Sequence, residues 1–177
     1  MKFNFFLLYI LFSYSLLAQQ FKSAEGQVTF FSDAAIEDIS AINKGASSIF
    51  DLSNGEIVFL ITIMDFTFDK SLMQEHFNEK YMESDKFPRA TFKGKVTGFD
   101  MTVPGVQQVS AKGMLTIHGR SKEIDVKGSI EKQASLLLLK SAFMVELEDF
   151  KIKIPKLLWQ NIAERVEVKV DFTYKTI

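Results

Sequence analysis

The side chains that could do chemistry in this chain are few, and the most conspicuous is a histidine in a short turn. His118 precedes Gly119 and Arg120, between two segments of alternating apolar and polar residues. A histidine at this place could contact the polar head of a ligand or act as a general base. A histidine beside a turn glycine is more often a solvated part of the turn, and the sequence favours that interpretation.

A second candidate is a set of metal ligands on one expected helix. Glu75, His76 and Glu79 are spaced by three and four residues, which brings their side chains to one helical face. Charged residues on the solvated side of a helix reach this spacing by chance. We therefore expect no metal and no cofactor.

A third candidate is a basic strand face. Arg89, Lys93 and Lys95 share one parity and could meet a pyrophosphate or an anionic lipid surface. A solvated strand face is the simpler interpretation, so contact with a membrane surface stays an open alternative.

Several classes of chemistry lack their residues altogether. The chain contains no Cys, which removes disulfides, thiol nucleophiles and Cys-ligated metals. It has no Gly-rich phosphate loop, no zinc motif and no Ser-His-Asp order. The formal net charge of −1 gives no electrostatic reason for nucleic-acid binding. We expect no catalytic residues, and hence no enzyme.

The elements around these candidates are predicted to be mostly β-strands. In Val109–Ile130, two alternating apolar and polar stretches flank the Gly119 turn, a pattern typical of a hairpin. Similar alternation, or a continuous apolar run, gives a total of about eight strands in one domain. Apart from the hairpin, the expected strands are 25–31, 43–51, 56–64, 89–97, 135–147 and 166–174. Long antiparallel strands with short connections indicate a sandwich or an up-and-down barrel.

Two local patterns refine this picture. Asn54-Gly55 predicts a two-residue type I′ turn. One helix is expected over 71–82, begun by a capping box of Ser71 with Gln74. The strand at 56–64 is apolar on both faces, so the helix is expected either to lie over it or to close one end of a barrel.

The apolar faces of the strands could point inward or outward, and parity alone does not decide. Outward faces would make an outer-membrane barrel. The few Trp and Tyr, the helix between strands and the uniformly short turns favour inward faces. The 18 Phe then converge on a dry interior, as core residues or as the lining of a ligand cavity. The predicted ligand-binding residues are Phe30, Phe59, Ile61, Phe92, Leu115, Val126, Phe143 and Phe172.

The N-terminus predicts export. Lys2, the apolar run 5–12 and small residues up to Ala18 have the pattern of a cleavable signal peptide. We expect residues 1–18 to be removed and residues 19–177 to form the domain. The expected location is the periplasm or the cell exterior.

Several motifs together resemble the YceI-like family over about residues 21 to 176. They are 73–78 (MQEHFN), 82–88 (MESDKFP), 90–94 (ATFKG), 115–122 (LTIHGRSK) and 161–166 (NIAERV). The first strand departs from the pattern of many members, in which a His-Ser pair precedes Val-x-Phe. Here Glu25-Gly26-Gln27 precedes Val28.

This resemblance implies an all-β fold with one short helix, an eight-stranded antiparallel lipocalin-like β-barrel. It also implies a non-enzymatic carrier that holds an isoprenoid or fatty-acid-like lipid in the lumen, with a role linked to envelope stress or to lipid or quinone handling. The alternative is an exported barrel with a packed core, used for protein–protein or surface interaction. The oligomeric state stays open, a homodimer included.

Overall fold

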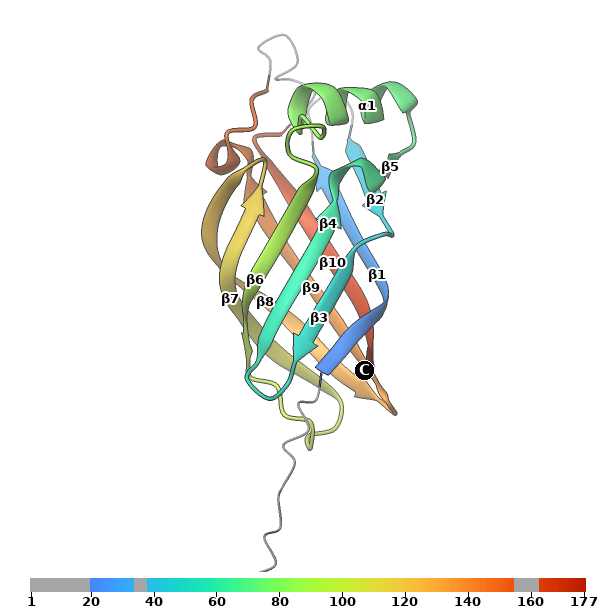
Figure 1. The fold of residues 1–177 in the computed structure, drawn as a ribbon, viewed down its shortest axis with the longest axis vertical. Coiled ribbons are helices and arrows are strands. Elements are labelled where there is room, and N and C mark those ends of the chain that lie inside the picture. Colours follow the sequence, from blue (N-terminus) through green and yellow to red (C-terminus); the bar gives the residue numbers. More distant parts are fainter. Residues whose placement is uncertain (1–19, 34–37, 155–162) are drawn as a thin grey trace, which may run out of the picture.

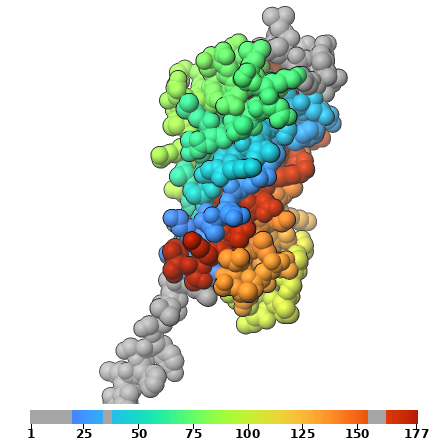
Figure 2. Space-filling view, turned by 90° about the vertical axis from the view of Figure 1, so that its right-hand side faces the viewer, coloured from blue at the N-terminus to red at the C-terminus, as the bar shows by residue number. Residues whose placement is uncertain are grey.

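The structure, a computed structural model, is a closed antiparallel β-barrel with a helix at one end (Figure 1). It describes residues 20–33, 38–154 and 163–177. The sheet order is β10-β9-β8-β7-β6-β4-β3-β1-β2-β5, and an additional β10–β1 pairing closes the barrel. Figure 2 shows this closure from outside: β1, in blue, lies beside β10, in red. The predicted sandwich is thereby excluded, and the eight-stranded barrel is confirmed.

The strands follow the alternation of the sequence. On the last strand, Phe172 and Tyr174 face inward and are fully buried, whereas Lys175 faces outward. The strands are β1 (Gln20–Ser32), β2 (Ile39–Asn43), β3 (Ser47–Asp51), β4 (Glu56–Thr62), β5 (Phe66–Phe68), β6 (Arg89–Thr97), β7 (Val106–Ile117), β8 (Arg120–Gln133), β9 (Leu136–Glu146) and β10 (Arg165–Thr176).

Two of the eight wall strands are each broken into two segments. β2 and β3 are the two segments of one wall strand. β4 and β5 are the two segments of the other, with the short helix η1 (Ile63–Asp65) between them. The pairing follows this division, since β2 pairs with β5 and β3 pairs with β4. Asn43 joins the breaks: its Nδ2 donates to the Thr62 carbonyl at 2.8 Å, and its Oδ1 accepts from the Gly45 N–H at 2.9 Å. Asn43 is fully buried, so these bonds satisfy a side chain that would otherwise destabilise the interior.

The helical segment closes one end of the barrel (Figure 1). It consists of α1 (Ser71–His76) and the π-helix η2 (Phe77–Tyr81). Phe77 anchors it, with its ring centroid 5.4 Å from that of Phe30 and 5.0 Å from that of Phe68. The second of the two predicted positions is therefore correct, and the outer face of β4 stays partly exposed, with Val58 at 39%.

The predicted capping box is wrong. The N-cap of α1 is Lys70 and has no side-chain cap hydrogen bond. The side chain of Gln74 instead accepts from the Phe68 N–H at 3.3 Å, which ties the helix to β5.

Of the two turns that the sequence predicted, the one at Gly119 is present and the one at Asn54-Gly55 differs. His118 and Gly119, with φ of 49° and 68°, form a two-residue turn between the paired residues Ile117 and Arg120. The predicted two-residue turn at Asn54-Gly55 is instead a four-residue loop between the paired residues Asp51 and Glu56.

The end of the barrel opposite α1 is a packed core. Phe21, Phe50, Phe172 and Tyr174 fill it and are at most 2% exposed. The ring of Phe50 lies 6.4 Å from that of Tyr174, whose hydroxyl hydrogen-bonds Ser48 Oγ at 2.7 Å. This base closes the lumen from below.

In the part of the chain that the structure describes, no helix has the length and apolar character needed to cross a membrane. The predicted signal peptide, residues 1–18, lies outside the described residues, as do Asn161 and Ile162 of the 161–166 motif.

Candidate ligand cavity

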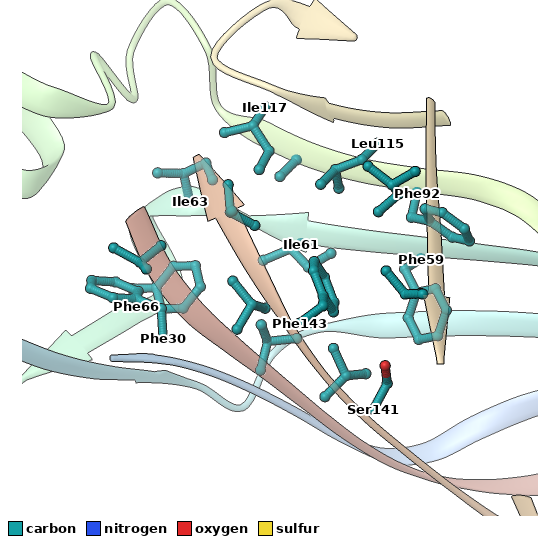
Figure 3. Close-up of a pocket in the computed structure, with 18 of the residues that line it drawn as sticks. Phe30, Phe59, Ile61, Ile63, Phe66, Phe92, Leu115, Ile117, Ser141 and Phe143 are labelled. Atoms are coloured by element: carbon teal, nitrogen blue, oxygen red, sulfur yellow. The ribbon is translucent and has the colours of Figure 1, made fainter. Parts of the chain in front are cut away.

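Above the packed base, the barrel encloses a cavity of about 320 Å³. Its walls are inward side chains of the strands, and α1 and η2 contribute Met73, Phe77 and Tyr81 at the closed end. Figure 3 shows Phe59 and Phe92 together on one side of this cavity and Phe30 with Phe66 on another. Among the residues labelled there, only Ser141 carries a polar side chain.

Seven of the eight predicted ligand-binding residues line this cavity. They are Phe30, Phe59, Ile61, Phe92, Leu115, Val126 and Phe143. Phe172 does not line it. Its ring is fully buried in the base, 5.0 Å from the ring of Phe59 and 6.0 Å from that of Tyr174. Contact of these residues with a ligand stays a prediction.

Sequence reasoning missed other lining residues. Met73, Phe77 and Tyr81 follow one another at intervals of four residues, and this shared helical face was a sufficient signal in the sequence. Val166, Val168 and Val170 also line the cavity and share the parity of Phe172. Phe66 and Phe68 follow the break after β4, where the sequence predicted no strand.

Four polar side chains line the cavity, those of Ser32, His76, Tyr81 and Ser141, and both serines are hydrogen-bonded. Ser32 Oγ accepts from the Ala163 N–H at 3.0 Å. Ser141 Oγ donates to the Lys127 carbonyl at 2.7 Å. Such an interior favours ligands by burial of apolar surface, because it offers few partners for a charged or reactive group.

His118 lies outside this lining and holds the covered end of the barrel together. Its Nδ1 lies 3.2 Å from the Phe150 carbonyl oxygen, and its Nε2 lies 3.2 Å from Glu83 Oε2. Phe150 belongs to the short helix η3 (Leu147–Phe150), and Glu83 follows η2. The ring also packs on Phe87 at 4.4 Å between centroids. His118 is thus a connecting residue of three segments, and this assigns a structural role to the LTIHGRSK motif.

The electrostatics of this connection centre on Glu83. Its pKa lies below the ordinary value of 4.5, first because of the hydrogen bond from Lys86 and also because of the one from His118; desolvation opposes the shift. The carboxylate therefore stays charged at neutral pH.

The other sequence candidates do not converge. His76 lines the cavity, whereas Glu75 and Glu79 are exposed. The described residues contain no group of three His, Cys, Asp or Glu that could hold a metal ion. Arg89, Lys93 and Lys95 are exposed on the outer face of β6.

Several solved structures have a fold similar to this barrel. A polyisoprenoid-binding domain from Saccharophagus degradans, implicated in plant cell wall breakdown, has a TM-score of 0.76 at 14% identity, covering 89% of this chain and 98% of that one. Burkholderia cenocepacia BcnA has a TM-score of 0.71 at 15% identity, covering 84% and 95%. The Campylobacter jejuni YceI protein has a TM-score of 0.63 at 17% identity, covering 80% and 86%. At these identities the likeness establishes the fold alone.

No curated protein matches this sequence. The model of the YceI-like domain, however, matches residues 9–174, which is nearly the whole chain. This chain belongs to the YceI-like domain family.

Proposed function

We propose that this protein is a non-enzymatic carrier that holds the apolar tail of an isoprenoid or a similar lipid inside its barrel. The single observation that supports this most directly is the cavity of about 320 Å³ with its almost wholly apolar lining. The name of the S. degradans neighbour, a polyisoprenoid-binding domain, agrees with such a ligand class.

Burial of the lipid tail alone supplies enough free energy for binding. Each buried methylene contributes about 0.8 kcal/mol, so a prenyl unit of a tail contributes about 3–4 kcal/mol before the cost of ordering it. Two or three units therefore suffice for tight binding without a polar contact.

The size of the cavity limits the length of the enclosed tail. A dry cavity of about 150 Å³ holds one benzene ring, so 320 Å³ has room for about a dozen carbon atoms. A longer tail must extend out of the cavity.

The alternative, a barrel with a packed core used for surface contacts, is supported only by the base around Phe21, Phe50 and Tyr174. A fully packed core would leave no room between this base and α1. The cavity there favours the carrier over a purely structural barrel.

Export belongs to the same proposal. The charge at Lys2 and the apolar run after it support cleavage near Ala18 and release into the periplasm or the medium. Mass spectrometry of the mature N-terminus tests this, and an intact Met1 on the exported protein would overturn it.

The binding proposal is tested by displacement of the fluorescent apolar dye N-phenyl-1-naphthylamine with farnesol and geranylgeraniol. Ala111 lines the cavity, so Ala111→Phe fills part of it. Ala24→Phe, at an exposed site, is the matched control. We expect the wild type and the control to bind both alcohols, and Ala111→Phe to bind about tenfold more weakly, because roughly two methylene equivalents of burial are lost.

Thermal unfolding of both variants shows whether each is folded. If the folded wild type displaces no dye with either alcohol, or if Ala111→Phe binds as tightly as Ala24→Phe, the carrier proposal is wrong.

A further inference from the structure

The barrel wall is interrupted between β8 and β9. Their ladder runs from the pair Gln133–Leu136 to the pair Gly128–Ser141 and ends there. On its other side, β8 pairs with β7 as far as Arg120, and β9 pairs with β10 as far as Glu146. Residues 120–127 of β8 and 142–146 of β9 thus face each other without a ladder; we call this stretch the seam.

The seam is bounded at both ends. At its lower end, the Ser141 hydroxyl donates to the Lys127 carbonyl at 2.7 Å. At its upper end, η3 crosses towards β8: Lys122 forms an ion pair with Asp149, and His118 contacts the Phe150 carbonyl. The interruption is therefore a window of limited length in the wall.

The window leads to the cavity. Ile124 and Val126 on its β8 side and Phe143 and Val145 on its β9 side all line the cavity. An apolar chain that passed between the two strands would meet these apolar side chains on the inner side of the window.

A polar hollow lies on the outer side of the same place. Gly128, Ser141 and Val170 line both this hollow and the cavity, so small side chains separate the two. The charged residues of the hollow are Lys127, Lys140, Lys169 and Asp171, three lysines against one aspartate. Lys140 is paired with Asp171 at 3.2 Å, and Lys169 is paired with Glu167 at 2.9 Å; these side chains are half or more exposed except that of Glu167, and such pairs are weak and exchangeable. Lys127 has no ion pair among the described residues.

We propose that the seam is a lateral portal: the tail of an amphiphile passes between β8 and β9 into the cavity, while an anionic phosphate or carboxylate head stays outside on Lys127, Lys140 and Lys169. This inference rests on the proposed carrier function. It assigns the polar end of the ligand to a cationic outer surface, where no charge has to enter the apolar cavity.

The portal is tested by closing it with a covalent tether. If the ladder register continued past Gly128–Ser141, Asp125 would face Met144 across the seam; both are exposed. The chain has no Cys, so Asp125→Cys with Met144→Cys places the only two thiols there for a short bis-maleimide. The control pair is Met114→Cys with Glu123→Cys, which are directly paired on the intact β7–β8 ladder.

The measurement is stopped-flow exchange of N-phenyl-1-naphthylamine by geranylgeranyl monophosphate. We expect the seam tether to slow association and dissociation by about tenfold or more with little change in affinity, because a blocked passage changes the barrier and not the bound state. The control tether should leave both rates unchanged. Unchanged rates with the seam tether would overturn the portal and leave the carrier intact; absence of exchange in untethered protein would overturn both.

The head site is tested with two ligands that share one tail. Lys127→Gln with Lys169→Gln should weaken geranylgeranyl monophosphate by about tenfold at low salt and leave geranylgeraniol unchanged, since only the phosphate gains from the cations. Lys93→Gln with Lys95→Gln, on the outer face of β6, is the control of equal charge. Inorganic phosphate alone should not compete. Equal effects of the two lysine pairs, or equal effects on the alcohol and the phosphate, would contradict this head site.

Discussion

An ideal Cβ atom on Gly26 would lie 2.3 Å from Cε1 of Phe172 and 2.6 Å from the carbonyl oxygen of Ala46. The Phe172 ring thus occupies the space that a side chain on β1 would need. This relationship fixes the level at which the packed base ends. It also accounts for the glycine at this position of β1.

Gly26→Ala is expected to lower the free energy of unfolding by about 1–3 kcal/mol, because the added methyl overpacks a fully buried ring. Urea unfolding measures this. Gly26→Ala combined with Phe172→Leu should cost less than the sum of the two single changes, since the smaller side chain makes room. Simple additivity of the two changes would contradict the proposed contact.

His118→Ala is expected to destabilise the protein by about 1–3 kcal/mol, because the Phe150 carbonyl and the Glu83 carboxylate both lose a part-buried partner. Arg120→Ala, at an exposed position of the same turn, serves as the control and should stay within about 0.5 kcal/mol of the wild type. Chemical denaturation of the two variants compares them, and equal effects would show that the histidine is only a solvated turn residue.

The lowered pKa of Glu83 predicts an acid dependence. A carboxyl whose pKa is lower in the folded state contributes stability that is fully present above its ordinary value of 4.5 and is lost as the pH falls through the lowered pKa. Unfolding of the wild type and of Glu83→Gln should therefore differ most near neutral pH and converge as the pH falls through the lowered pKa. A difference that stays constant across this range would show that the carboxylate charge contributes nothing.

Tyr174 predicts an alkaline dependence. Burial raises the pKa of its hydroxyl well above the ordinary value of 10.0, although the hydrogen bond with Ser48 acts in the opposite direction. A raised pKa means that its stabilisation is complete below pH 10 and declines as the pH rises further. Absorbance of tyrosinate should show one tyrosine that ionises only on unfolding, and Tyr174→Phe should remove it. Reversible ionisation of this tyrosine in folded protein would contradict its burial.

The sequence predicted the inward and outward faces well, because a period of two is a local property of a strand. The side chains of Phe143 on β9 and Phe172 on β10 both point into the barrel, yet Phe143 lines the cavity and Phe172 lies in the base. What separates them is their level along the barrel. That level follows from the register of β9 with β10 and from the space at Gly26, and neither is visible in a single strand.

At Asn54-Gly55, hydrogen bonds from the backbone to nearby side chains override the local turn pattern. Asp51 Oδ1 accepts from the Ser53 N–H and Asn54 Oδ1 from the Glu56 N–H, so the loop is longer than the Asn-Gly pair predicts, and only Gly55 within it has a positive φ. The π-helix η2 could not be predicted either. In it the Met82 N–H donates to the Phe77 carbonyl, and the Phe77 ring packs against Phe30 and Phe68, which are distant in the sequence.

The seam, too, could not be predicted from the sequence. The residues of β8 and β9 alternate through it without a break, and nothing in their pattern distinguishes a paired edge from an unpaired one. Gly128 was the one available sign: a Cβ there would lie 2.6 Å from the Lys140 carbonyl oxygen, which shows how closely the last pair of the ladder approaches.

The central claim is that the lumen holds a lipid tail, and extraction of natively purified protein measures this most directly. Wild-type protein and Ala24→Phe, expressed and purified without detergent, are extracted with organic solvent, and the extract is analysed by lipid mass spectrometry. The account predicts a prenyl or similar long-chain lipid in near-stoichiometric amount from both, and much less from Ala111→Phe. Repeated recovery of folded protein without lipid, or an equal yield from all three proteins, would contradict it.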